Sequence, residues 1–284
     1  MNADDFGLTA GVNRAIIELH DAGLLTSTTL MARASATDEA IELARATPSL
    51  GVGCHVVLVD GEPVRAPSDL PTLVDPRTGR FHPTLGAFLK RLLTGRLGDV
   101  EIEAETAAQI ALLRNRGVRL THIDTHKHVH MFPTVLKPVL RAARAAGIRA
   151  VRNPFEPAWS LRATPGAPWV RRKEVSLLRW LEPVFRRIVA EEGFATTGGA
   201  VGVLATGTLD AATAASLLAA LPEGTFELVS HPGYNDDALA HAHTRLLASR
   251  NTERLALRTL TQFPAVELVS FAALGPRAAS IQGD

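Results

Sequence analysis

Short apolar segments alternate with amphipathic helical patterns along this chain, and that alternation limits its fold more than any other feature. The β-branched or apolar segments predict strands at residues 26–31, 51–59, 119–124, 150–152, 201–204, 226–230 and 266–271. Apolar residues at helical spacing predict helices at residues 9–22, 37–46, 100–116, 134–146, 210–220 and 245–261. Repeated strand–helix units favour a parallel sheet, so the predicted fold class is α/β, with the sheet open or closed.

The composition limits the functions that this chain can have. Its 30 basic and 29 acidic residues give a net charge of +1, which offers no global attraction for nucleic acid. No apolar run approaches the roughly 18 residues of a spanning helix, so no transmembrane segment is expected. Cys54 is the single cysteine, and the polar start lacks a signal-peptide pattern. We therefore expect a cytoplasmic enzyme with a local binding site.

A run of histidines is the first candidate for chemistry. The segment T-H-I-D-T-H-K-H-V-H-M places His122, Asp124, His126, His128 and His130 at every second position. If the segment is extended, these side chains share one face, which could bind metal and transfer protons. Neighbours on that face are roughly 6.6 Å apart, so they cannot all bind one ion. We expect His126 to be a ligand, and Asp124 and His128 to orient it or contact substrate.

Other polar residues lie at or just beyond the ends of predicted strands. Asp4 and Asp5 stand side by side near the start, His55 lies in the 51–59 strand, and His231 follows the 226–230 strand. Functional groups of α/β sheets collect at the carboxyl ends of strands, so these residues could form one site. Each has a plainer interpretation, since an Asp pair can cap a helix and a lone histidine is usually structural.

Five motifs, in one order, resemble those of the YdjC-like carbohydrate deacetylases. They are N-A-D-D-F-G-L from Asn2, T-S-T-T-L-M ending at Met31, P-S-L-G-V-G-C-H ending at His55, the histidine run continued by F-P, and S-H-P-G-Y ending at Tyr234. Three further segments, V-L-V-D-G-E-P-V, D-P-R-T-G-R-F and V-R-N-P-F-E-P, look closer to the hopanoid-biosynthesis-associated branch than to the chitooligosaccharide branch.

The resemblance implies a fold, a reaction and a set of residue roles. The fold would be a (β/α) barrel of the glycoside hydrolase/deacetylase type, as a single domain over residues 1–284. The reaction would remove the N-acetyl group from an acetylated amino sugar, free or attached to a lipid such as a hopanoid. Asp5, His55 and His126 match the metal positions, Asp4 the general base and His231 the general acid. The family implies Mg²⁺, whereas two imidazoles favour Zn²⁺ or a similar ion, so both remain open.

One departure from the family pattern concerns the start of the chain. Family members usually carry an apolar strand before the Asn-Ala-Asp-Asp segment, and here Met1 directly precedes Asn2. We therefore expect the first barrel strand to be missing or truncated, or the true start to lie upstream. The Asp pair would then be poorly anchored.

A helical insertion is expected near residues 160–195. An apolar stripe with basic residues around it runs through residues 169–192, and Pro183 should divide it into two helices. The stripe could form a lid or dock on a membrane surface that holds a lipid substrate. A plain amphipathic helix pair with a solvated basic face is the favoured interpretation. Arg152 and Tyr234 are candidate substrate contacts, with a surface role equally plausible for each.

The sequence is also compatible with two alternative functions. A hydrolase of another bond, such as a phosphoester, would favour a second metal. A catalytically inactive sugar-binding protein would be consistent with a missing first strand. The oligomeric state, a homo-oligomer included, is not determined by the sequence.

Overall fold

The computed structural model describes residues 1–260 and 266–274, and its centre is a parallel β-sheet. In this part of the chain the sheet has six strands in the order β4-β3-β2-β1-β6-β5, and every pairing is parallel. The strands are β1 (Asn2–Phe6), β2 (Ser27–Met31), β3 (Gly51–Val56), β4 (Leu120–Thr125), β5 (Ala200–Val201) and β6 (Glu227–Ser230). This arrangement confirms the predicted α/β class.

Single bridges continue the sheet beyond β4 and bend it toward closure. Ile123 of β4 bridges Val151 in parallel, and Ala150 bridges Ala195. Five residues after Ala195 the chain enters β5, which pairs with β6 at the other edge of the sheet. The parallel contacts thus pass around from β4 to β6, as a (β/α) barrel requires.

The first strand is present, so the prediction of a missing strand is wrong. β1 pairs with β2 on one side and with β6 on the other, which places it in the middle of the sheet. A strand can form these backbone hydrogen bonds without an apolar sequence, and the buried polar side chains of β1 have hydrogen-bond partners inside the barrel. Asn2 Nδ2, for example, donates to Asp4 Oδ1 at 2.9 Å. The Asp pair is therefore anchored on both sides.

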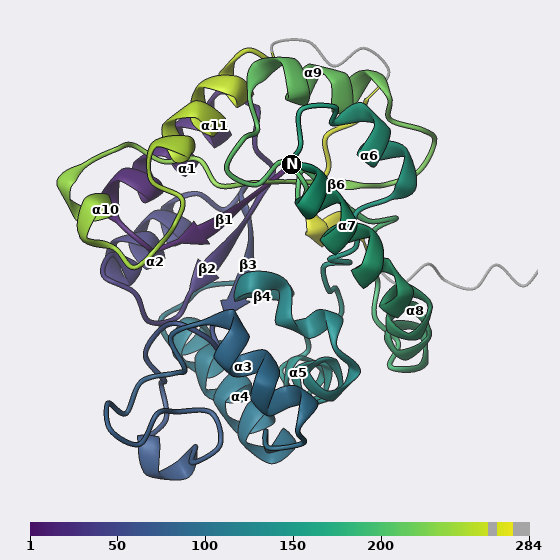
Figure 1. Cartoon of the computed structure of the whole chain (residues 1–284). Helices are drawn as coiled ribbons and strands as arrows, with labels where there is room; N and C mark the ends of the chain where they lie inside the picture. Colours follow the sequence, from purple (N-terminus) through teal and green to yellow (C-terminus); the bar gives the residue numbers. More distant parts are fainter. Residues whose placement is uncertain (261–265, 275–284) are drawn as a thin grey trace, which may run out of the picture.

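Helices pack around the sheet in the alternating pattern that the sequence predicted (Figure 1). Thr9 caps the first helix by accepting from the backbone N–H of Val12. Pro183 lies in the first turn of a helix, so the predicted division of the 169–192 segment is confirmed. The helices are α1 (Ala10–Asp21), α2 (Thr37–Ala46), α3 (Leu85–Leu93), α4 (Asp99–Asn115), α5 (Pro133–Ala145), α6 (Ala158–Ala163), α7 (Trp169–Leu178), α8 (Glu182–Glu191), α9 (Ala211–Ala219), α10 (Asp237–His241) and α11 (Ala248–Arg258).

Two local predictions differ from the structure. Residues 266–270 form no strand and lead into the 3-10 turn η4 (Phe271–Ala273), while Thr261, the predicted end of the last helix, lies outside the described residues. The histidine run is extended only as far as Thr125 and continues as the 3-10 segment η2 (His126–Met131). Lys127 and His128 there have φ values of 58° and 55°. The prediction that the whole run shares one face is therefore wrong beyond β4.

The other 3-10 turns are η1 (Pro67–Asp69), in the loop after β3, and η3 (Arg179–Leu181), between α7 and α8. In the described ranges no helix combines the length and apolar character needed to cross a membrane.

Candidate metal centre and acid–base pair

The carboxyl end of β1 delivers both Asp carboxylates to the interior of the barrel. Adjacent strand residues normally point to opposite faces. Here the pairing register with β2 shifts between Ala3 and Phe6, and Asp5 has a φ of 66°, a left-handed conformation that Asp tolerates better than most residues. Asp4 consequently contacts Arg152, while Asp5 faces His55 and His126.

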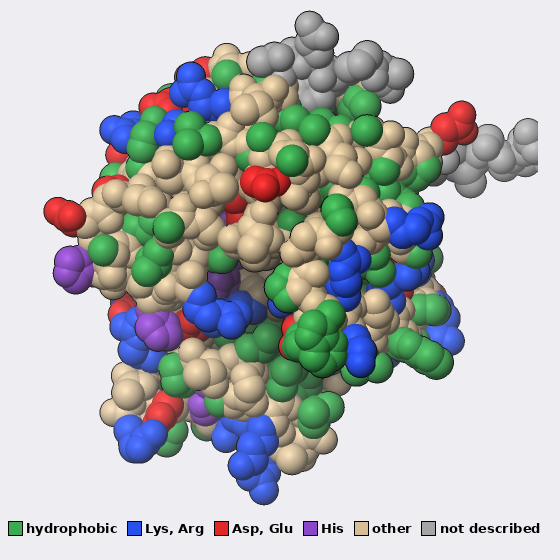
Figure 2. Space-filling model, turned by 45° about the horizontal axis from the view of Figure 1, so that its top comes forward, with side chains coloured by type: hydrophobic (Ala, Val, Ile, Leu, Met, Phe, Trp, Pro, Cys, Tyr) green, Lys and Arg blue, Asp and Glu red, His purple; other side chains and the backbone are tan. Residues whose placement is uncertain are grey.

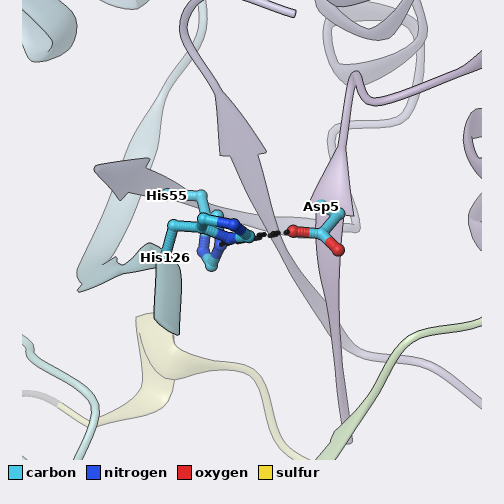
Figure 3. Close-up of side chains that lie close together, drawn as sticks. All are labelled: Asp5, His55 and His126. Atoms are coloured by element: carbon cyan, nitrogen blue, oxygen red, sulfur yellow. Dashed lines mark hydrogen bonds and ion pairs between the residues drawn. The ribbon is translucent and has the colours of Figure 1, made fainter. Parts of the chain in front are cut away.

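Three ligand atoms converge at this point from three different elements. Asp5 Oδ1 lies 3.4 Å from His55 Nε2 and 3.5 Å from His126 Nδ1, and the two nitrogens are 3.2 Å apart. Figure 3 shows both imidazoles facing the Asp5 carboxylate. The point equidistant from these atoms is about 1.9 Å from each, close to the roughly 2.0–2.2 Å of zinc or magnesium bonds to such ligands. The three residues fit one divalent cation.

Asp124 fixes the orientation of His55. The Nδ1–H of His55 donates to Asp124 Oδ1 at 2.8 Å, which leaves the Nε2 lone pair directed at Asp5 and His126. Burial lowers the pKa of His55, but the carboxylates of Asp124, Asp5 and Asp4 together outweigh burial and raise that pKa to about 10. The surroundings of His55 therefore favour positive charge, whether it comes from a proton or from a cation.

A second possible metal site has carboxylates that are already paired with an arginine. Asp4, His55 and Asp124 also bring ligand atoms close together, but Arg152 donates to both carboxylates. A cation there would have to compete with Arg152 at both carboxylates, whereas the buried Arg250 contacts only Oδ2 of Asp5 and leaves Oδ1 facing the two imidazoles. Among the described residues, the set of Asp5, His55 and His126 is therefore the better metal site.

Arg152 is a fully buried ion-pair hub and not a group open to a ligand. Its guanidinium donates to Asp4 at 2.6 and 2.7 Å, to Asp124, and to Glu227 at 2.6 and 2.9 Å. Burial raises the pKa values of Asp4 and Asp124, but Arg152 outweighs it and holds both below their ordinary value. Burial dominates for Glu227 and raises its pKa. One cation thus keeps two of the three acids ionised.

His231 lies beside Asp4 at the end of β6. Its Nε2 is 3.8 Å from Asp4 Oδ2, and its Nδ1 is 3.8 Å from Glu253 Oε2. The backbone N–H of His231 donates to the same Glu253 oxygen at 2.6 Å. Burial lowers the pKa of His231, but Glu253 and then Asp4 outweigh burial and raise it. An ionised carboxylate and an imidazole that favours its protonated form therefore stand next to each other.

The structure does not bring all the predicted substrate contacts to this centre. His128 is half-buried, and its Nδ1 has no partner among the described residues. Burial lowers the pKa of His128 to about 3, so its ring is neutral. The Tyr234 hydroxyl instead donates to Glu18, and its ring lies between the guanidinium groups of Arg14 and Arg254. Tyr234 is therefore engaged with α1 and α11.

Sequence reasoning missed three charged residues that complete the site. Glu227 pairs with Arg152, Glu253 with His231, and Arg250 donates to Asp5 Oδ2 at 2.5 Å. A charge inside the apolar strand 226–230 was a readable signal for Glu227. Arg250 and Glu253 belong to a helix rich in charged residues, so nothing in the sequence separates them from surface groups.

Comparison with known proteins gives matches over most of the chain. Residues 1–263 match a family model described as YdjC-like protein. Carbohydrate deacetylases of Halalkalibacterium halodurans and Brevibacillus brevis are 40% and 41% identical over 51% and 55% of this chain. These two matches span 59% and 58% of the relatives' own length. A carbohydrate deacetylase of Thermoanaerobacter pseudethanolicus is 30% identical over 90% of this chain and 89% of its own.

A solved structure supports the same fold. A protein of Enterococcus faecalis V583, described as a proposed cellobiose-phosphate cleavage protein, superposes with a TM-score of 0.73 over 96% of this chain and 97% of its own, at 24% identity. At that identity the likeness establishes the fold. The predicted (β/α) barrel is thereby confirmed.

Proposed function

Because this chain belongs to the YdjC-like family, we propose that it is a metal-dependent carbohydrate deacetylase, which hydrolyses the N-acetyl group of an acetylated amino sugar. One observation carries the proposal: the Asp5–His55–His126 triangle lies directly beside the Asp4–His231 pair. A divalent cation, a base and an acid are the groups that amide hydrolysis requires. The relatives named carbohydrate deacetylase support the same activity.

The proposed mechanism assigns each side chain one role. Asp5, His55 and His126 hold the cation, which when bound polarises the acetyl carbonyl and stabilises the charge on its oxygen. Asp4 accepts a proton from the water that attacks the acetyl carbon. His231 donates a proton to the departing amine as the C–N bond breaks. Acetate and a free amino sugar are the products. Asp124 acts through His55, and Glu253 acts through His231.

The finer features of this function are also proposals. Two imidazoles and one carboxylate favour Zn²⁺ or a similar ion, and the resemblance to the family favours Mg²⁺. The segments that resemble the hopanoid-associated branch favour a sugar carried on a lipid. The half-buried His128 of the same histidine run is a proposed substrate contact.

The direct test is acetate release from a panel of N-acetylated amino sugars. The protein is treated with EDTA, and Zn²⁺, Mg²⁺ and Co²⁺ are then added back separately. Metal-restored acetate release would support the proposal and identify the ion. Phosphate release from phosphorylated sugars that requires two ions would favour a phosphoesterase instead. Sugar binding without acetate release by metal-loaded protein would favour a binding protein.

Replacement of His126 by alanine is expected to weaken metal binding about 100-fold, because one of three protein ligands is lost. The side chain of His126 is 21% exposed, so the change should cost little stability. Metal stoichiometry after dialysis against a weak chelator measures the effect. His128→Ala, two residues away in the same run, is the matched control and should retain the metal. Full metal occupancy in His126→Ala would refute the ligand assignment.

The pH dependence of kcat/KM should show its alkaline limb above the ordinary histidine pKa of about 6.5. His231 donates only when protonated, and its pKa is raised, so activity is present below that pKa and lost as pH rises through it. Asp4 has a lowered pKa and contributes no acidic limb above about pH 4. Glu253→Gln removes the raising charge and should move the alkaline limb to lower pH. An unmoved limb would contradict the role of His231.

A further inference from the structure

The helix α7 and the turn η3 expose three large apolar side chains on one face. Trp169, Leu177 and Trp180 are 67%, 70% and 82% exposed. Their spacing of eight and eleven residues places them within an arc of about 80° at 100° per residue. Val175 points to the other side of α7, where it is only 7% exposed and packs against Leu204. One side of α7 therefore holds it to the protein, and a second apolar side faces solvent.

An ordinary amphipathic helix pair does not explain this face. In the neighbouring helix α8 the apolar stripe behaves as expected, because Phe185 and Ile188 are 0% and 4% exposed. The apolar residues of the solvent-facing side of α7 are instead among the most exposed large hydrophobics in the described part of the chain. Two of the three tryptophans in the sequence, Trp169 and Trp180, belong to the exposed face that α7 and η3 form. An exposed cluster of this kind indicates an interaction surface.

The charge around the face is positive. Residues 169–191 contain six basic and three acidic side chains, whereas the whole chain is nearly neutral. Lys173 lies on the same face, with Nζ 4.8 Å from the centre of the Trp169 ring. Arg186 and Arg187 are exposed on α8, where they pair with Glu182 and Glu191, and the segment as a whole keeps its excess of basic residues. Figure 2 shows hydrophobic side chains interleaved with Lys and Arg in this region.

We propose that α7 and η3 dock on the surface of an anionic phospholipid membrane. Tryptophan favours the boundary between headgroups and acyl chains because its ring is apolar and its N–H is polar. Basic residues beside it are attracted to anionic lipid headgroups. Charge complementarity selects this occupant over a second copy of the chain, since two copies would bring the same positive faces together.

Docking through α7 would also orient the candidate active site toward the membrane. Figure 2 shows a hollow with histidine side chains on the same side of the molecule as the exposed face. A protein held by α7 would therefore present this hollow toward the membrane, where an acetylated amino sugar on a lipid carrier could enter. This consequence rests on the proposed deacetylase function, whereas the docking itself does not.

Cosedimentation with vesicles tests the proposal. The full chain should bind vesicles that contain phosphatidylglycerol at least tenfold more strongly than pure phosphatidylcholine vesicles, and added salt should reduce the difference. The variant W169S/W180S should lose tenfold or more of its binding to anionic vesicles. The matched control is L93S/V100S, which removes two equally exposed apolar residues on α3 and α4 and should bind as the unmodified protein does.

The results separate docking from activity. Acetate release from a soluble acetylated sugar should be unchanged in W169S/W180S, since neither residue belongs to the proposed catalytic machinery. Vesicle binding without any deacetylation would keep the docking and refute the proposed function. No binding to anionic vesicles by the unmodified protein, or equal loss in L93S/V100S, would overturn the docking. Dimerisation that W180S abolishes would assign the face to a second copy and overturn it as well.

Discussion

Replacing Asp4 with asparagine is expected to reduce kcat by about 10²–10⁴-fold while the metal stays bound. The amide of asparagine cannot accept the proton of the attacking water, so activity should fall. The metal should stay bound because Asp4 is not one of the three proposed ligand residues. Steady-state acetate release and metal stoichiometry on the same sample measure the two properties. Loss of the metal together with activity would place Asp4 among the ligands instead.

The matched control for this variant is Glu227→Gln. Asp4 and Glu227 both pair with Arg152, so each substitution removes one carboxyl partner of the same buried guanidinium. In the described part of the chain, the Glu227 side chain makes no hydrogen bond or ion pair with His231 or with the proposed ligands. We expect Glu227→Gln to keep kcat within about tenfold of the unmodified enzyme. Equal losses in both variants would mean that Asp4 acts by holding Arg152 and not as a base.

Substituting Arg152 by methionine is expected to cost about 3–5 kcal/mol of unfolding free energy. The side chain is fully buried, and its removal would leave Asp4, Asp124 and Glu227 without the guanidinium that all three contact. Urea unfolding of metal-free protein at neutral pH measures the loss. A change below about 1 kcal/mol would contradict the description of Arg152 as the cation that the three acids require.

The pH dependence of the same variant separates charge from packing. Arg152 holds the pKa values of Asp4 and Asp124 below their ordinary value, so its stabilisation is present above the unfolded pKa and lost as pH falls toward the folded pKa. The stability difference between Arg152→Met and the unmodified protein should therefore shrink in acid. Arg152→Lys, which keeps the charge but cannot bridge three carboxylates, should lie between the two. A difference that is constant with pH would indicate lost packing.

Local patterns in the sequence predicted much of the fold. The helix at residues 37–46 has the predicted bounds, and the helix α1 lies within the predicted residues 9–22. The prediction of a missing first strand failed because that segment has no local strand pattern to read. β1 is short and polar, and it is a strand because β2 and β6 pair with it on both sides. β2 follows after one helix, but β6 lies more than two hundred residues further along the chain.

The residue types and order of the candidate site could also be predicted from the sequence. An Asp pair, His55 at a strand end, a histidine run and His231 after a strand are visible as motifs, because strand ends and family motifs are local signals. The motifs do not indicate how each side chain turns. Alternation would send Asp4 and Asp5 to opposite faces and would continue the histidine run on one face. The left-handed backbone at Asp5 and at His128 changes both.

The sequence by itself determined the α/β class, the family and the candidate residues of the proposed site. The tertiary structure alone decided their charges and partners. Arg152 reaches Asp4 across 148 residues, and Arg250 reaches Asp5 across 245. Such pairs leave no periodic trace, because the two members belong to different strand–helix units. Their energies depend on burial, which exists only once the barrel has formed and has excluded water from its interior.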